Sequence, residues 1–241
     1  MNKSEVPFPR GACPIFSFGP EDRSSPLVLF FPDAFGPRPA SFDVAEEIAA
    51  AGWRVLMLDQ FYENIPYELL TPKSLFEEGP ERDRVMQMFM SVTMAKIDED
   101  VAAMVALAEA QSDAGVPFAA VGYCMGGRYA LSAVTGSARV RFAGAFHASN
   151  IAPAGGDSPH QRFAGTRGRI YIGVAGIDPT YDAEEHGRLA QALRDADVDH
   201  VIESYHQMGH GWVYPDLAIY DEKGAKKHMA RIKEHFAEMI G

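Results

Sequence analysis

The 241-residue chain has the length of one large α/β domain or two small ones, and its 47% hydrophobic and 23% charged residues are ordinary globular proportions. A formal net charge of −11 argues against a nucleic-acid surface and gives an anionic substrate no long-range attraction. We expect a cytoplasmic protein with free thiols at Cys13 and Cys124, since residues 1–10 hold no apolar signal region and no stretch approaches the ~18 apolar residues of a membrane span.

The first part of the chain alternates apolar runs with a helical period. Residues 11–18 are broken by a proline, which favours a short edge strand or hairpin that flanks the sheet. The continuous apolar run at residues 27–31 predicts a strand buried on both faces. Residues 40–51 predict a helix closed by a glycine, and residues 54–58 predict the next strand.

The pattern changes at residues 61–93, where prolines and glycines separate short pieces and methionines gather near the end. We expect short helices over the top of the sheet, forming a lid-like insertion above an apolar substrate. The commoner alternative is that these methionines pack in the core. A long amphipathic helix is predicted next, at residues 95–114.

Strands and helices alternate again in the second half. Strands are predicted at residues 118–122, 142–147, 169–175 and 200–205, and helices after residue 126, at 183–196 and from about 217 to 240. This alternation implies an α/β fold with a mostly parallel central sheet and helices on both faces. No repeat or linker divides the sequence, so we expect residues 1–241 to form a single domain.

The strand at residues 118–122 leads directly into Gly122-Tyr123-Cys124-Met125-Gly126. This pattern is typical of a nucleophile elbow, a strained strand-turn-helix in which the residues two positions either side of the nucleophile must be small. The turn would lift Cys124 clear of the sheet, beside N–H groups and a helix dipole that stabilise a thiolate. The alternative is a small buried cysteine in a glycine-rich turn.

Two other residues follow predicted strands, where ligands bind in an open parallel sheet. They are Asp178 and His210, and with Cys124 they occur in the order nucleophile, acid, histidine that α/β-hydrolases use. We expect Cys124 to attack a carbonyl carbon, His210 to act as base and then acid, and Asp178 to orient the imidazole. The backbone N–H groups of Ala34 and Met125 would bind the oxyanion.

Each assignment has a competitor. Asp178 precedes a proline and is also a natural turn former. His206, His200 and His147 compete with His210, which we prefer because glycines flank it in a loop. No helical pair of histidines supports a metal site, so we expect neither metal nor cofactor.

With these residues placed, the chain resembles the dienelactone hydrolase family. The resemblance spans about residues 28–236 and rests on the elbow, the Asp33-Ala34-Phe35-Gly36 loop, Gly176-x-Asp178 and Gly209-His210-Gly211. It implies an α/β-hydrolase fold, a Cys-His-Asp triad, a cytoplasmic location and hydrolysis of an enol-lactone or related ester.

The resemblance also implies that the carboxylate of Asp33 interacts with the Cys124 thiol and helps to produce the thiolate, although the family enzyme has a longer Glu there. A nearby carboxylate by itself raises the pKa of a thiol through repulsion. Asp33 is therefore expected either to gate the thiol until substrate arrives or merely to cap the turn at Phe35.

Arginines bind the substrate carboxylate in the family enzyme, one of them shortly after the catalytic histidine. Here Tyr214 stands at that place, and Arg82 and Arg84 are the candidate replacements. Phe35 and Trp212 are the other expected substrate contacts.

The sequence thus predicts a cofactor-free hydrolase that opens lactones or cleaves small esters through a thioester at Cys124. A general small-ester carboxylesterase, a non-catalytic ligand-binding protein and a redox-sensing thiol protein are the alternatives. The expected partner is a small lactone or ester, with no nucleic acid and no membrane, and the protein is expected to be a monomer or small homo-oligomer.

Overall fold

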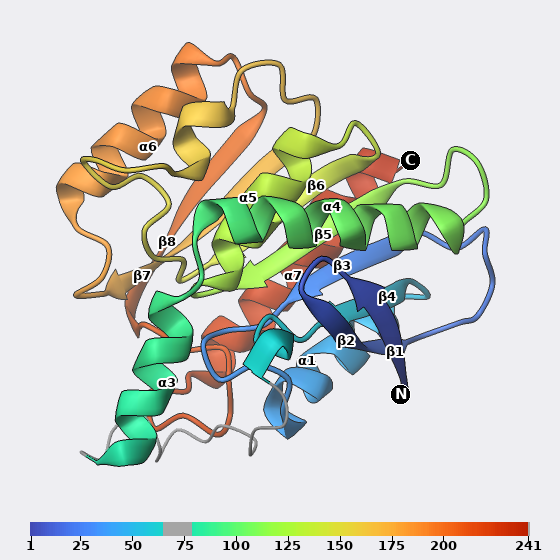
Figure 1. The fold of residues 1–241 in the computed structure, drawn as a ribbon. Coiled ribbons are helices and arrows are strands. Elements are labelled where there is room, and N and C mark those ends of the chain that lie inside the picture. Colours follow the sequence, from blue (N-terminus) through green and yellow to red (C-terminus); the bar gives the residue numbers. More distant parts are fainter. Residues whose placement is uncertain (65–78, 241) are drawn as a thin grey trace.

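The structure is a computed structural model that describes residues 1–64 and 79–240 (Figure 1). Its centre is an eight-stranded sheet with the order β1-β2-β4-β3-β5-β6-β7-β8. The strands are β1 (Asn2–Phe8), β2 (Gly11–Phe18), β3 (Leu27–Phe31), β4 (Arg54–Leu58), β5 (Phe118–Tyr123), β6 (Val140–Phe146), β7 (Arg169–Ile177) and β8 (His200–Gly209). All neighbours from β4 to β8 run parallel, and the β1–β2 hairpin adds two antiparallel strands at one edge.

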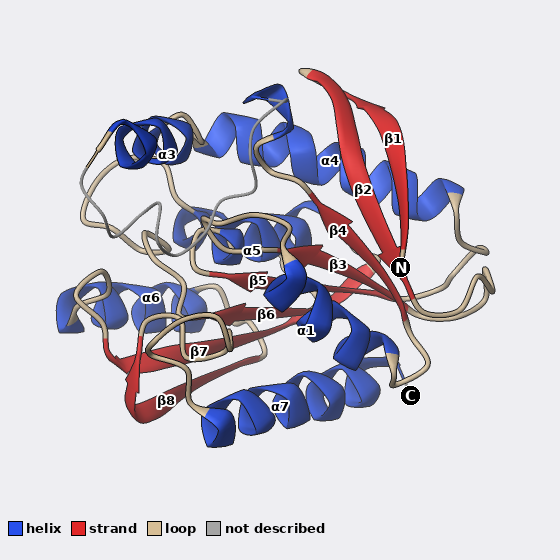
Figure 2. Ribbon diagram, turned by 90° about the horizontal axis from the view of Figure 1, so that it is seen from below, coloured by secondary structure: helices blue, strands red, loops and turns tan. Residues whose placement is uncertain are grey.

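Helices cover both faces of the sheet (Figure 2). One face carries α1 (Pro39–Ala49) and α7 (Glu222–Ile240), and the other carries α4 (Met94–Ala110), α5 (Gly126–Gly136) and α6 (Ala183–Asp195). The short helix α3 (Pro80–Met90) and the 3₁₀ turns η1 (Tyr62–Asn64) and η2 (Pro159–Arg162) complete the described elements. The predicted fold class is confirmed. No helix within residues 1–64 and 79–240 is long and apolar enough to cross a membrane.

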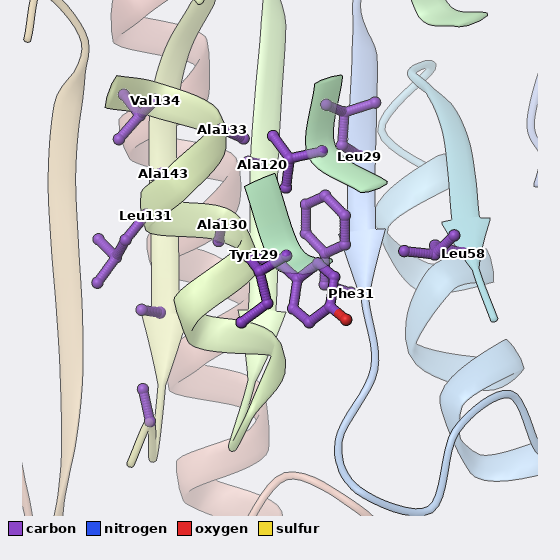
Figure 3. Close-up of a cluster of buried hydrophobic side chains, with 14 of the residues drawn as sticks. Leu29, Phe31, Leu58, Ala120, Tyr129, Ala130, Leu131, Ala133, Val134 and Ala143 are labelled. Carbon is purple, nitrogen blue, oxygen red and sulfur yellow. The ribbon is translucent and has the colours of Figure 1, made fainter. Parts of the chain in front are cut away.

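One core cluster packs α5 against β3, β5 and β6 (Figure 3). Phe31, the last residue of β3, stacks on Tyr129 of α5 with ring centroids 5.3 Å apart. Both side chains are almost completely buried. This aromatic pair fixes the distance between the end of β3 and the start of α5, the two elements that border the candidate site.

Two predicted elements differ from the structure. The strand β2 belongs to the hairpin that the sequence allowed for at the flank of the sheet, but its partner β1 was not predicted and is the edge strand. The proline of β2 is tolerated since the β2–β4 register covers only Ile15 to Phe18. The last helix begins at Glu222, five residues later than predicted. Its start is set by Asp221, whose carboxylate accepts the N–H of Gly224 at 2.7 Å.

The predicted lid is described only in part, since residues 65–78 lie outside the described residues. In α3, Val85 and Met88 are buried in the core, as the alternative interpretation of this segment expected, whereas Met86 and Met90 are exposed. The same helix therefore serves as a core element and presents methionines outward.

Candidate active site

Cys124 occupies a strained turn at the carboxyl end of β5. Its φ is +53°, in the left-handed region that only a few non-glycine residues adopt, and its N–H donates to the carbonyl of Phe146 at 3.0 Å. The two glycines are required by close contact: a Cβ on Gly122 would lie 2.0 Å from the Gly126 carbonyl oxygen, and one on Gly126 would lie 2.2 Å from the Phe31 carbonyl oxygen. The strand and helix close on each other as a nucleophile elbow requires.

His210 and Asp178 both lie at the carboxyl end of the parallel strands, Asp178 directly after β7 and His210 directly after β8. The Nδ1 of His210 contacts the Oδ2 of Asp178 at 2.7 Å, and the carboxylate is almost completely buried. Thr180 holds the other oxygen of Asp178 through its N–H at 2.9 Å and its hydroxyl at 2.7 Å. The sequence analysis did not identify Thr180, although a threonine two residues after an aspartate is a recognisable turn pattern.

The electrostatics of His210 depend on Cys124. Burial lowers the pKa of His210, but the charge of Cys124, a hydrogen bond with its sulfur and the contact with Asp178 outweigh burial and raise the pKa to about 10. Burial likewise raises the pKa of Asp178, yet the hydrogen bonds from His210 and Thr180 bring it below its usual value. The arrangement therefore favours a protonated imidazole between two acidic groups.

Ala34 lies in the loop after β3, and Met125 directly follows Cys124 at the start of α5. In the described part of the chain, neither backbone N–H donates to a protein acceptor. The loop is held by Gln60, whose side-chain amide donates to the carbonyls of Pro32 at 3.1 Å and Asp33 at 2.6 Å. Gln60 carried no sequence signal, because its role depends on β3 and β4 being neighbours in the sheet.

A cavity of about 410 Å³ opens over Cys124 and His210. Its walls are mainly apolar. Most of the apolar side chains come from three segments, Ala34 and Phe35 after β3, Val85, Met86 and Phe89 of α3, and Leu217, Ala218 and Ile219 after β8, and the lining also includes His147 and Ser149 after β6 and Pro179 and Thr180 after β7. Its volume and lining are those of a small-molecule site.

The glycines beside His210 make room for one of these walls. A Cβ on Gly209 would lie 2.5 Å from the side chain of Ile219, and a Cβ on Gly211 would lie 2.7 Å from the side chain of Leu217. Gly211 also has a φ of +100°. The segment that we expected to begin the last helix is thus a loop folded over the histidine.

The competing histidines occupy different places. His206 is exposed, and His200 stands at the start of β8, away from the carboxyl end of the strand. His147 lines the cavity, with its ring centroid 5.0 Å from that of His210. Burial, followed by repulsion from His210 and His228, lowers the pKa of His147 well below its usual value, so its imidazole is neutral. Of the four, only His210 contacts Asp178.

Comparison with known proteins agrees with this fold. The model of the dienelactone hydrolase family matches residues 14–240. The chain belongs to the dienelactone hydrolase family. It is 24% identical, over 196 residues, to dienlactone hydrolase 2 of Gibberella moniliformis, a match that covers 80% of this chain and 68% of that protein. The protein is therefore a hydrolase.

Solved structures share the fold at lower identity. A protein described as a dienelactone hydrolase from Klebsiella pneumoniae superposes with a TM-score of 0.82 at 17% identity, covering 98% of this chain and 97% of that one. The dienelactone hydrolase-like promiscuous phosphotriesterase P91, from metagenomic libraries, has a TM-score of 0.79 at 18% identity and covers 100% and 98%. Esterase 2 of Thermogutta terrifontis has a TM-score of 0.70 at 16% identity and covers 98% and 93%.

In this family member, Asp33 does not hold the thiol. Its two carboxylate oxygens accept hydrogen bonds from the guanidinium of Arg38 at 2.6 and 3.1 Å, and Oδ1 also accepts the N–H of Phe35 at 3.0 Å. Arg38 in turn donates to Asp216 at 2.7 Å. This geometry supports the turn-capping role rather than the gating role, because partners other than Cys124 occupy the short carboxylate.

Four of the residues expected to contact substrate do not line the cavity. Trp212 and Tyr214 are completely buried and do not line the cavity. Their large rings pack inward, Trp212 on Tyr205 at 4.6 Å between ring centroids and Tyr214 beneath the Arg38 guanidinium at 4.5 Å. Arg82 and Arg84 lie on α3 but are not among the described residues that line the cavity. Phe35 does line it.

Proposed function

We propose that this protein hydrolyses carboxylic esters and lactones through a thioester on Cys124, in a reducing cytoplasm. The observation that carries the proposal is the grouping of three side chains at the apolar cavity. Cys124 has a φ of +53°, His210 lines the same cavity and has its pKa raised by Cys124, and Asp178 lies 2.7 Å from Nδ1 of His210. A binding protein or a redox sensor does not need a histidine beside its thiol or an aspartate that orients that histidine.

The first half of the reaction forms the thioester. The Cys124 sulfur attacks the carbonyl carbon while His210 carries the thiol proton, and Asp178 keeps the imidazolium oriented. The carbonyl oxygen becomes an oxyanion that the N–H groups of Ala34 and Met125 receive, each contributing roughly 3 to 4 kcal/mol. When the intermediate collapses, the C–O bond breaks and the leaving alkoxide takes the proton from His210.

The second half releases the acid. His210, now neutral, removes a proton from a water molecule, and the resulting hydroxide attacks the thioester carbonyl. The same two N–H groups receive the second oxyanion. Its collapse breaks the C–S bond, returns the sulfur of Cys124 to its pairing with His210 and yields the carboxylic acid. For a lactone the alcohol and the acid remain parts of one product.

The test combines a substrate screen with direct detection of the intermediate. Wild-type protein should hydrolyse 4-nitrophenyl esters or simple lactones, and Cys124→Ala should lose at least about a thousandfold in turnover. Mass spectrometry after a rapid quench should find the acyl group on Cys124. His210→Ala should be as damaging, whereas His206→Ala, at an exposed position, should cost little. Turnover that survives Cys124→Ala refutes the proposal.

Ligand binding without turnover, or fast reversible oxidation of Cys124 by low peroxide without any hydrolysis, would instead favour the two non-hydrolytic alternatives. Cys13 is the internal control. It is completely buried, and burial followed by repulsion from Asp59 raises the pKa of its thiol far above the usual value. Cys13→Ala should therefore leave hydrolysis and alkylation of Cys124 unchanged.

A further inference from the structure

Nearly all of the surface that lines the cavity is apolar. Val85, Met86 and Phe89 lie on α3, at positions three and four apart that share one side of a helix. Leu217 and Ile219 form the wall above the glycines that flank His210. A bound acyl group would therefore contact hydrocarbon on two opposed segments.

Apolar side chains continue outward from the cavity onto the surface. Met86 and Ile219 line the cavity and yet are 39% and 46% exposed. Met90, one turn beyond Met86, is 72% exposed, and Ile177, which pairs with Gly209 beneath Ile219, is 62% exposed. Apart from Met1 and Tyr220, the neighbour of Ile219, these are all the large apolar residues exposed in the described chain. Grouping of this kind marks a binding surface.

Positive charge is absent from the same lining. Among the described residues that line the cavity there is no arginine or lysine. Arg38 lies behind the Asp33 loop, but Asp33 and Asp216 occupy its guanidinium, and the rings of Phe35 and Tyr214 cover it at 5.0 and 4.5 Å. Arg128 interacts electrostatically with Cys124 but does not line the cavity. A substrate carboxylate placed in the cavity would lose its hydration and, among the described lining residues, meet no cation except the catalytic imidazole.

We infer that the site takes neutral esters or lactones with an extended apolar group, and that it discriminates against substrates that carry a carboxylate. The inference rests on the proposed function. The apolar group fills the space between α3 and the Leu217–Ile219 wall and continues over Met86, Met90 and Ile177. Each additional buried methylene should raise kcat/KM about fourfold until the surface is covered.

The test uses matched pairs of 4-nitrophenyl esters. The 6-methylheptanoate and the adipate monoester have the same length and shape at the chain end but differ in charge. Wild type should prefer the neutral ester by at least about a hundredfold in kcat/KM, and the butanoate, hexanoate and octanoate series should rise with length. An anionic ester turned over as well as its neutral partner, or a flat chain-length series, overturns the inference.

A charge placed at the mouth should shift this preference. Ile219→Arg should raise the kcat/KM of the adipate monoester relative to the 6-methylheptanoate by at least about tenfold, because the guanidinium supplies the missing partner. The matched control is Gln191→Arg, which adds the same charge on the exposed side of α6, outside the cavity lining, and should leave the ratio unchanged. Equal shifts in both variants would assign the preference to net charge and refute the cavity as its source.

A binding measurement separates the two proposals. Octanamide should protect Cys124 from iodoacetamide at concentrations at least about tenfold lower than the monoamide of octanedioic acid does. If no ester is hydrolysed but this selectivity is found, the proposed function fails and the inferred ligand class stands. If esters are hydrolysed through Cys124 and both amides protect equally, only the inferred ligand class fails.

Discussion

The carboxylate of Asp33 and the guanidinium of Arg38 form a two-point ion pair, with Nη1–Oδ1 at 2.6 Å and Nη2–Oδ2 at 3.1 Å, and both side chains are buried. Arg38 also reaches Asp216, so one side chain joins the loop that carries Ala34 to the loop that follows His210. The ion pair thus connects the loop of Ala34, a proposed oxyanion donor, to a wall of the cavity. Two predictions depend on it.

Arg38→Met should destabilise the protein by about 3 to 5 kcal/mol, because it leaves a buried carboxylate without its partner. Urea denaturation at neutral pH measures the change. The double variant Arg38→Met/Asp33→Asn should recover part of the loss, since it removes the uncompensated charge. Lys226→Met, which breaks an exposed pair with Glu222, is the control and should leave stability close to wild type. A single variant as stable as that control would contradict the role assigned to Arg38.

Asp33→Asn should lower thermal stability while leaving the pH profile of Cys124 alkylation unchanged, because the carboxylate caps the Phe35 turn and pairs with Arg38. Iodoacetamide labelling of Cys124 across pH, beside a thermal melt, makes the comparison. A displaced alkylation profile together with a large fall in turnover would restore the hypothesis that Asp33 gates the thiol.

Stability should fall as the pH rises, through the deprotonation of His210. The pKa of His210 is about 10 in the folded protein and about 6.5 when unfolded, so the folded state binds the proton more tightly. This contribution is complete below about pH 6.5 and is lost as pH rises toward about 10. Urea unfolding of wild type and His210→Gln over this range should show a stability difference that shrinks with pH. A difference that grows with pH would contradict the assignment.

Gly126→Ala should abolish folding or activity, because the added methyl group would lie 2.2 Å from the Phe31 carbonyl oxygen and 2.5 Å from that of Pro32. Backbone atoms of a buried strand cannot move aside cheaply. Gly136→Ala, at the other end of the same helix, has nothing within 4 Å of the new Cβ and should be neutral or stabilise by up to about 1 kcal/mol. Soluble yield, circular dichroism and turnover distinguish the two variants. An active, stable Gly126→Ala protein would refute the close packing of the elbow.

The amino-acid sequence alone identified the features that depend on short-range backbone chemistry. The elbow at Cys124 was predictable because glycines two residues either side leave few other conformations for such a turn. The parallel sheet followed from apolar runs alternating with helical periods, and the ends of the strands indicated Asp178 and His210 as candidates. The family was recognised from these same local motifs, and the family model agrees.

Only the tertiary structure showed which distant groups meet. Arg38 contacts Asp216, 178 positions away, and this contact exists only because two loops meet above the sheet. For that reason no spacing rule could indicate that the Asp33 carboxylate is already hydrogen-bonded to Arg38. Trp212 and Tyr214 follow the histidine in sequence, as substrate contacts would, but the turn after β8 directs them into the core. The direction of a side chain from a loop depends on what packs around it, which a linear pattern does not contain.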